Sequence, residues 1–384
     1  ISYKMTKKIL FALLMAFSAS IAMACTSAII SGSKTANGRP ILWKHRDTGE
    51  EDNKVERIAA TDSTLAYVAL FNASDLKCES AWMGYNSAGF AVMNTASYNL
   101  KDDDVPDSKM DREGYLMAKA LKTCKTVDDF ENLLKTYPRP MGVEANFGVI
   151  DAQGNGAYFE TNNHSYLKFN LSDAPDGVLI RTNYSYSGRT DGGKGYIRHD
   201  NLTQLIAPHI AKGDFTPEFF TETVSKTYLH TLLGIDYTNS GAKWIIDQDF
   251  IPRYTSTCTC AIEGILPGED VSLTTMWIGL GFPPCAELRA VWLWDGGLPQ
   301  ELRGTLPNGH SPLCDTVVKR KHEAFCITRG SGSHYINFEV LYNKQGTGYC
   351  QTLAKVNKEA YANGYKTLEQ RRQQLAQKKS KRKK

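Results

Sequence analysis

The stretch Ala22-Met23-Ala24-Cys25-Thr26-Ser27-Ala28-Ile29-Ile30 decides the fold we expect, because it joins two different kinds of sequence at one cysteine. Before it come three lysines within the first eight residues and an apolar run from residue 9 to residue 24, the pattern of a removable signal peptide. Ala22 and Ala24 supply the small-residue cleavage signal. Cleavage there would make Cys25 the first residue, directly before a β-rich run.

A cysteine at a free N-terminus carries two reactive groups. Its thiol can attack a carbonyl, and its α-amine, with a pKa of about 7.7 to 8, can take the thiol proton. Two other roles compete, a lipid-modified cysteine and one half of a disulfide. Lipidation favours a Leu-like residue three positions before the cysteine with small residues between, and Ala22 and Met23 fit that pattern poorly. We therefore predict that Cys25 is a nucleophile.

Length and composition predict an exported protein, periplasmic or secreted, with an outer-surface lipoprotein as the less favoured alternative. The N-terminal apolar run is short for a membrane span of about 20 residues, and no other long apolar run follows, so we expect no stable membrane insertion. The nine cysteines are an odd number, which leaves at least one free thiol even if the rest pair. Cys25 would be that thiol, and the pairing of the other eight stays open.

The net charge of +4 is unevenly distributed. The three lysines near the start and the basic residues from 371 to 384 carry the positive balance, which leaves the body mildly acidic. Such a basic end could touch nucleic acid or anionic lipid, but a solvated, disordered end is the commoner outcome. We therefore expect no nucleic-acid partner.

A predicted β-hairpin brings further polar residues to Cys25. Residues 26–31 form the first strand, 36–39 the turn, and 40–44 the return strand, which leads into Lys44-His45-Arg46-Asp47. The end of the second strand then lies beside the start of the first. Asp47 would accept a hydrogen bond from the α-amine, and the ammonium of Lys44 would favour the thiolate.

More strands and helices follow along the chain. We predict strands at residues 65–71, 80–85, 89–94, 146–151, 157–161, 177–182, 254–262, 272–279 and 290–294, and helices at 114–124, 126–135, 196–210 and 217–233. Thr126 is a predicted N-cap. Asn94 and Asn183 each lie at the end of a strand. Asn94 could offer its side-chain and backbone N–H groups to one oxygen, as an oxyanion hole requires.

The glycine-rich residues 188–195 partly match a phosphate-binding loop, but Gly195 occupies the position where Ser or Thr must hold magnesium. We interpret this segment as a mobile loop, with Arg189 and Arg198 as anchors for an anionic substrate. Cys258 and Cys260 share one face of a strand, and no second ligand pair accompanies them, so core packing is favoured over metal binding. We predict no cofactor and no metal.

The ordered set of motifs resembles the cysteine branch of the N-terminal nucleophile hydrolases, which includes choloylglycine hydrolases, penicillin V acylases and the acyl-coenzyme A:6-aminopenicillanic acid acyltransferase group. The resemblance covers most of the chain after residue 24. Its motifs are Cys25-Thr26, Lys44-His45-Arg46-Asp47, Gly84-Tyr85-Asn86-Ser87-Ala88-Gly89-Phe90, Met93-Asn94, Asp151 with its turn, Thr182-Asn183 and Tyr254-Thr255-Ser256-Thr257-Cys258.

This resemblance implies an α+β fold, a four-layer αββα sandwich with two antiparallel sheets between helices. It implies Cys25 as nucleophile, Asp47 as partner of the α-amine, Asn94 as oxyanion donor and Asn183 as a contact of the substrate or intermediate. Lys44 stands where choloylglycine hydrolases have Arg. A further active-site Arg of that family matches Arg198, or Gly195 in another alignment, so the acyltransferase group is the closer resemblance.

We therefore predict an exported cysteine hydrolase that cleaves the linear amide bond of an N-acyl amide, a conjugated acid or a small peptide through a thioester on Cys25. An acyltransferase with the same site and a non-enzymatic, lipid-anchored surface protein are the alternatives. The expected organisation is a signal peptide at 1–24, one hydrolase domain at 25–355, and a charged, helical, basic tail at 356–384. A homo-oligomer is possible on this view.

Overall fold

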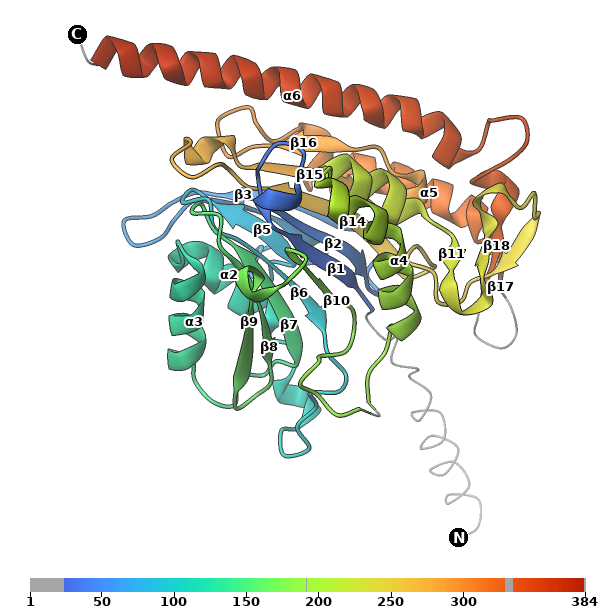
Figure 1. The fold of residues 1–384 in the computed structure, drawn as a ribbon, viewed down its shortest axis with the longest axis horizontal. Helices are drawn as coiled ribbons and strands as arrows, with labels where there is room; N and C mark the ends of the chain where they lie inside the picture. Colours follow the sequence, from blue (N-terminus) through green and yellow to red (C-terminus); the bar gives the residue numbers. More distant parts are fainter. Residues whose placement is uncertain (1–23, 191, 329–333, 383–384) are drawn as a thin grey trace.

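Two large antiparallel sheets face each other between layers of helices in the computed structural model, which describes residues 24–190, 192–328 and 334–382 (Figure 1). The predicted signal peptide lies outside the described residues, apart from Ala24. The first sheet has six strands in the order β10 (Val178–Arg181), β1 (Thr26–Ile30), β2 (Ile41–Asp47), β14 (Ser256–Glu263), β15 (Thr275–Leu280) and β16 (Arg289–Val291).

The second sheet has seven strands, each paired with the next along the chain. They are β3 (Asn53–Ile58), β4 (Tyr67–Asn72), β5 (Met83–Asn86), β6 (Ala91–Ala96), β7 (Ala145–Ile150), β8 (Gly156–Thr161) and β9 (Tyr166–Asn170). The helices are α2 (Glu113–Thr123), α3 (Val127–Thr136), α4 (Tyr196–Lys212), α5 (Pro312–Ala324) and α6 (Tyr349–Arg382). Smaller pieces are the hairpin of β11 (Leu229–His230) with β12 (Ile235–Asp236), and a sheet of β13 (Trp244–Ile246), β18 (His334–Asn337) and β17 (Ile327–Thr328).

Strand alternation explains the layering, because successive side chains of a strand point to opposite faces. In β1, Ile29 packs into the core between the two sheets, whereas Ala28 and Ile30 pack against the outer helical layer. In β2, Leu42 faces the inter-sheet core and Trp43 the outer layer. Both strands are therefore buried on both faces, and a polar side chain on either of them needs a partner.

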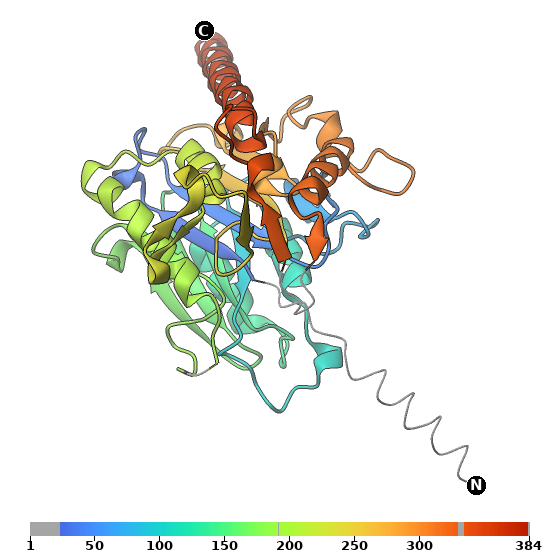
Figure 2. The ribbon, with the colours of Figure 1, turned by 90° about the vertical axis from the view of Figure 1, so that its right-hand side faces the viewer.

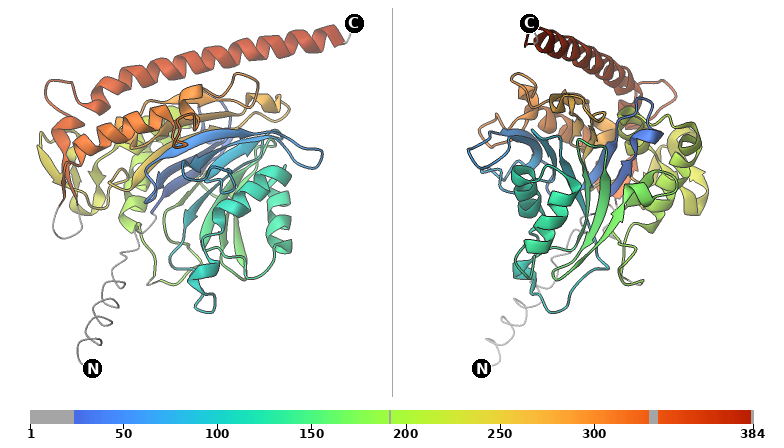
Figure 3. Two further views of the ribbon diagram at one scale, coloured as in Figure 1. Left: turned by 180° about the vertical axis from the view of Figure 1, so that it is seen from behind. Right: turned by 60° about the vertical axis from the view of Figure 1, so that its left-hand side comes forward.

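Helices cover both outer faces. The seven-stranded sheet packs against α2 and α3, where Phe130 contacts the rings of Phe147 and Phe159. The six-stranded sheet packs against α4 and α6, where Tyr361 stacks on Trp277 with ring centroids 4.3 Å apart. The left view of Figure 3 shows α6 running along one side of the molecule, with α2 and α3 on the other, and Figure 2 looks nearly along the axis of α6. These layers confirm the predicted αββα sandwich.

Several local predictions are confirmed and others are wrong. Thr126 caps α3 in a capping box with Asp129. The prediction of one helix at residues 217–233 is wrong. This segment forms a π-helical turn at Phe219–Thr223, a 3-10 turn at Val224–Lys226 and the hairpin strand β11. Side chains compete for its backbone, since Ser225 Oγ donates to the Phe220 carbonyl oxygen at 2.9 Å.

Other elements were not predicted from the sequence, namely β3, β9, α5 and the β13–β18–β17 sheet. Asn94 does not end its strand, because β6 continues to Ala96. The basic end was expected to be disordered, yet it continues α6 to Arg382. All nine cysteines lie in the described part of the chain, and each is a free thiol. No helix in that part is both long enough and apolar enough to span a membrane.

Candidate active site

Cys25 lies at the entrance of the β1–β2 hairpin, directly before β1. The two strands pair antiparallel with Thr26 opposite His45 and Ser27 opposite Lys44, as the sequence predicts. The hairpin therefore returns β2 past the cysteine, and the Cys25 thiol lies 3.8 Å from the backbone carbonyl oxygen of Asp47. Cys25 is only 3% exposed, so little water screens its sulfur from nearby charges.

The carboxylate of Asp47 is fully buried and accepts hydrogen bonds from two side chains. Ser256, opposite Asp47 in the β2–β14 ladder, donates from Oγ at 2.5 Å. Arg253, just before β14, forms an ion pair with the other carboxylate oxygen. The same guanidinium nitrogen donates to the carbonyl oxygen of Ala24 at 2.6 Å. Arg253 thus joins Asp47 to the peptide bond between Ala24 and Cys25.

His45 belongs to this cluster but does not contact the thiol. Its Nε2 lies 2.8 Å from Ser256 Oγ. Because that hydroxyl gives its proton to Asp47, it accepts from His45, which places the imidazole proton on Nε2. Burial lowers the pKa of His45 to about 4, with the negative charge of Asp47 opposing the shift. His45 is therefore a neutral donor at neutral pH.

Lys44 lies on the other face of β2 and reaches across to the second sheet. Its ammonium donates to Asn94 Oδ1 at 2.8 Å and to the Trp82 carbonyl oxygen at 3.1 Å. Burial lowers the pKa of Lys44 to about 8, although negative charge on Cys25 opposes this shift. The bond to Oδ1 fixes which end of the Asn94 amide faces the lysine, so the amide N–H₂ group faces away from Lys44.

Arg198 holds the backbone of the cysteine itself. From the first turn of α4 it donates to the Cys25 carbonyl oxygen at 2.6 Å and to Thr26 Oγ1 at 2.8 Å. Its other terminal nitrogen donates to Asn183 Oδ1 at 2.8 Å. A Cβ built on Gly195 would lie 2.2 Å from this guanidinium, so only glycine at that position leaves room for it.

The two asparagines differ in how their side chains are used. Asn183 bonds Arg198 through its oxygen and the Ala96 carbonyl oxygen through its nitrogen, at 2.9 Å. It braces Arg198 here, and its predicted contact with the substrate stays a prediction. Asn94 is joined to the cluster through Lys44.

Arg189, predicted as a substrate anchor, has other contacts. Its side chain is half-exposed and lies 3.8 Å from Asp103. Its backbone N–H donates to the Asn99 carbonyl oxygen at 2.9 Å, and its carbonyl oxygen accepts from Asn99 Nδ2 at 3.0 Å. Within the described residues, none of these contacts connects it to the cluster around Cys25.

Arg253 and Ser256 are the members of the cluster that sequence reasoning did not assign a role. The predicted strand at 254–262 contained Ser256, but only its pairing with β2 puts that hydroxyl opposite Asp47. No local signal marks Arg253, which follows Pro252 in a loop.

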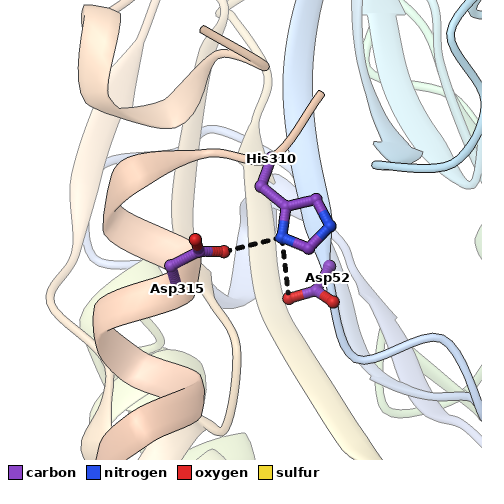
Figure 4. Close-up of side chains that lie close together, drawn as sticks. All are labelled: Asp52, His310 and Asp315. Carbon is purple, nitrogen blue, oxygen red and sulfur yellow. Dashed lines mark hydrogen bonds and ion pairs between the residues drawn. The ribbon is translucent and has the colours of Figure 1, made fainter. Parts of the chain in front are cut away.

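Two further groups could bind a metal by residue type, namely the two cysteines of β14 and a cluster of one histidine with two aspartates. Cys258 and Cys260 are buried on β14, and burial raises the pKa of both thiols, to about 12 for Cys258. Asp52, His310 and Asp315 have the spacing of metal ligands (Figure 4). However, His310 Nδ1 lies 2.9 Å from Asp315 Oδ1 and 3.5 Å from Asp52 Oδ1, so one ring nitrogen contacts both carboxylates directly. The prediction of no metal and no cofactor stays a prediction.

Comparisons with known proteins give matches only among solved structures. No family model and no curated protein matches the chain. A mutant of conjugated bile acid hydrolase from Clostridium perfringens is similar at 11% identity and a TM-score of 0.41, covering 70% of this chain and 92% of that one. A Caenorhabditis elegans ortholog of N-acylethanolamine-hydrolyzing acid amidase is similar at 11% identity and a TM-score of 0.38, covering 64% of this chain and 94% of that one. Penicillin V acylase from Agrobacterium tumefaciens is similar at 12% identity and a TM-score of 0.36, covering 70% of this chain and 86% of that one.

Proposed function

We propose that this protein is an exported cysteine hydrolase that cleaves a linear amide, with Cys25 as nucleophile once the residues before it are removed. The freed α-amine takes the thiol proton, and sulfur attacks the amide carbon. The α-ammonium returns this proton to the leaving amine as the C–N bond breaks. Water then hydrolyses the thioester, which releases the acid and restores the thiol.

The observation that carries this proposal is the shared contact of Arg253. One guanidinium nitrogen bonds both the Asp47 carboxylate and the carbonyl oxygen of Ala24. That carbonyl belongs to the same peptide group as the Cys25 nitrogen, so the buried carboxylate is close to the position at which an α-ammonium would appear. A negative charge there would hold the amine in place and stabilise it when it becomes protonated.

Lys44 and Asn94 supply the other half of the chemistry. The tetrahedral intermediate carries a negative oxygen, which is stabilised by N–H donors that are already oriented. Lys44 holds Asn94 Oδ1 and so turns the Asn94 amide N–H₂ group away from itself. A positive charge on Lys44 also favours the Cys25 thiolate.

The decisive experiment compares two soluble forms that differ by one residue. One begins at Cys25, and the other retains Ala24, which turns the α-amine into an amide that cannot accept a proton. Mass spectrometry confirms each N-terminus, and hydrolysis of a panel of N-acyl amides is then measured. The form beginning at Cys25 should hydrolyse one or more of these amides, and the extended form should lose nearly all turnover while melting at a similar temperature.

Equal turnover by both forms would contradict the proposed base. Cys25→Ala in the shorter form is the control for the nucleophile, because alanine has no group that can attack the amide carbon. Adding a second amine to the assay separates hydrolysis from acyl transfer, since capture of the acyl group would produce a new amide. A lipid mass on the cysteine of the exported protein would support the surface lipoprotein instead.

A further inference from the structure

A group of exposed apolar side chains lies on the β11–β12 hairpin and the neighbouring β13–β18–β17 sheet, at the right of Figure 1. A hollow of about 410 Å³ opens between the hairpin and β13. Most of the exposed apolar side chains of this region line the hollow, and the others pair with its lining across the strands. We call the group the hairpin patch, and its members are Leu232, Leu233, Ile235, Trp244, Ile246, Ile327 and Tyr335.

Strand alternation turns one face of the small sheet inward and the other outward. Ile245 of β13 and its partner Ile336 of β18 are buried in the core. The neighbouring pair, Ile246 and Tyr335, points the other way, and Ile327 of β17 pairs with Tyr335 in turn. An exposed apolar row therefore crosses all three strands on the outer face of this sheet.

The turn of the β11–β12 hairpin places two leucines beside this row. Thr231–Leu233 form a 3-10 turn in which no residue is buried, and Gly234 ends it with φ +63°. Leu232 is 71% exposed and Leu233 57%, and both lie at the edge of the hollow. Single exposed leucines are common in folded proteins, whereas a contiguous group of large apolar side chains marks a surface that binds a partner.

The hairpin patch has the size of a protein interface. Its seven side chains are 37% to 71% exposed, so they leave roughly 500 to 800 Å² in water if each large side chain has about 150 to 250 Å² of surface. The largest apolar patch of a soluble monomer is typically about 300 to 600 Å². A stable interface buries about 800 Å² on each partner. The patch therefore supplies most of the area that one half of a stable dimer needs.

Charged residues of both signs border the patch. Asp236 follows Ile235 in β12, Asp249 lines the hollow, and the exposed Lys243 precedes Trp244. The two aspartates would be repelled by an anionic lipid surface. Opposite charges on one surface can instead pair when that surface meets a copy of itself, which favours a second copy of this chain as the partner.

We propose that the hairpin patch is the interface of a homodimer, in which the Leu232–Leu233 turn of each copy enters the hollow of the other. A two-fold axis brings the same patch together on both chains, so a surface with a projecting turn beside a hollow is complementary to itself. Removal of the apolar side chains from water drives the association. This inference is independent of the proposed amide hydrolysis.

The test measures the dissociation constant of the dimer by sedimentation equilibrium of the exported protein. Leu232→Asp changes the projecting turn, and Trp244→Lys changes the hollow. Leu76→Asp is the matched control, because Leu76 is 73% exposed and does not belong to the patch. Thermal melts check that each variant is folded, and Leu232→Asp, on an exposed turn, decides the test if Trp244→Lys does not fold.

The parent should dimerise with a dissociation constant of about 1 to 100 µM or lower. Leu232→Asp should weaken the dimer at least about a hundredfold, because a two-fold axis places the unpaired carboxylate in both hollows at once. Trp244→Lys should act in the same direction, and Leu76→Asp should stay within about twofold of the parent.

Mixing the two variants tests the contact between turn and hollow. A chain with Leu232→Asp keeps its own hollow, and a chain with Trp244→Lys keeps its own turn. In their mixed dimer one contact is unchanged, and the other pairs the new carboxylate with the new ammonium. The mixture should therefore associate at least about ten times more tightly than either variant alone.

Several outcomes would overturn the inference. A parent that stays monomeric over this concentration range has no such interface. A dimer that Leu232→Asp leaves intact, or that Leu76→Asp weakens equally, uses another surface. A mixture that associates no better than its components rules out the contact of turn with hollow. Binding of a monomeric parent to phosphatidylglycerol vesicles that Leu232→Asp abolishes would assign the patch to a lipid surface instead.

Discussion

Asp47 combines two roles that normally conflict. A buried carboxylate is unfavourable unless it is paired, and Asp47 is paired with Arg253 and hydrogen-bonded by Ser256. Yet a carboxylate that is to hold a new α-amine must retain some acceptor capacity, and its two oxygens have about four lone-pair directions. This residue therefore has room for one more donor without giving up its present partners.

Asp47→Asn and Asn94→Ala should each lower turnover strongly in the chain that begins at Cys25. Loss of one oxyanion donor costs on the order of a hundredfold to a thousandfold in rate, and Asn at position 47 would remove the charge that holds the amine. Rates on the best amide substrate provide the measurement. Asn155→Ala, in the β7–β8 turn, is the control and should stay within twofold.

Stability distinguishes the two variants. Asp47→Asn leaves the partly buried Arg253 without the carboxylate that it pairs with, so its melting temperature should fall more than that of Asn94→Ala. Rates must be compared below both transitions. Parental turnover in both variants would contradict the assignment of the site.

His45 should affect the pH dependence of stability more than turnover. Its pKa is about 4 in the folded protein and about 6.5 when exposed, so protonation favours the unfolded chain between these values. Stability is thus fully present above about pH 6.5 and is lost as the pH falls toward 4, by about 3 kcal/mol over that range. Urea unfolding at pH 7 and 4.5 measures this loss.

His45→Gln should lose less stability between those two pH values than the parent does, and should keep much of its turnover at pH 7. His322→Gln is the control, since His322 is exposed at the end of α5. Abolished turnover in a folded His45→Gln protein would point to an imidazole base and against the α-amine.

At the scale of elements, the loop before α4 controls the position of Arg198. Gly195 precedes the helix with φ +83°, a conformation that glycine adopts readily and other residues rarely do. The sequence suggested a mobile glycine-rich loop, whereas this glycine makes space for the guanidinium that bonds Cys25 and Thr26.

Gly195→Ala should therefore reduce turnover at least tenfold, because its Cβ would displace Arg198 from the Cys25 carbonyl oxygen. Gly154→Ala is a matched control. Gly154 also has a positive φ, of +88°, but nothing lies within 4 Å of its Cβ position. Both variants should lose about 1 kcal/mol of stability through backbone strain. A similar loss of turnover in both would assign the effect to strain and not to Arg198.

At the scale of the whole molecule, α6 closes the outer face of the six-stranded sheet. Tyr361 is buried, stacks on Trp277 and bonds Thr221 Oγ1 at 2.7 Å. Further along the same helix, Leu368 belongs to a second buried cluster. The charged helix predicted as a tail therefore forms part of the helical layer over much of its length.

Tyr361→Ala should destabilise the fold by about 3 to 5 kcal/mol, the usual cost of removing a large buried aromatic side chain. Chemical denaturation measures the change. Val356→Ala, an exposed position of the same helix, should change stability by less than about 0.5 kcal/mol. Equal, small effects at both positions would show that α6 contributes little to the stability of the sheet.

The sequence by itself determined the features that are local along the chain. Alternating apolar residues set the strands and their two buried faces, and a short turn brought Asp47 back to Cys25, only 22 residues away. Thr126 and Asp129 fixed the start of α3 in the same local way. The prediction failed where helical spacing and hydroxyl side chains that bond the backbone occur together. At residues 217–233, for example, Ser225 Oγ donates to the Phe220 carbonyl oxygen, and no continuous helix forms.

The tertiary structure alone decided which distant residues complete the cluster. Arg253 is 206 residues from Asp47, and Arg198 is 173 residues from Cys25. Ser256 reaches Asp47 only because β14 pairs with β2 in one particular register, and Arg198 reaches Cys25 only because α4 packs on the sheet beside β1. Strand order and register arise from packing across the whole core, so no short stretch of sequence contains them.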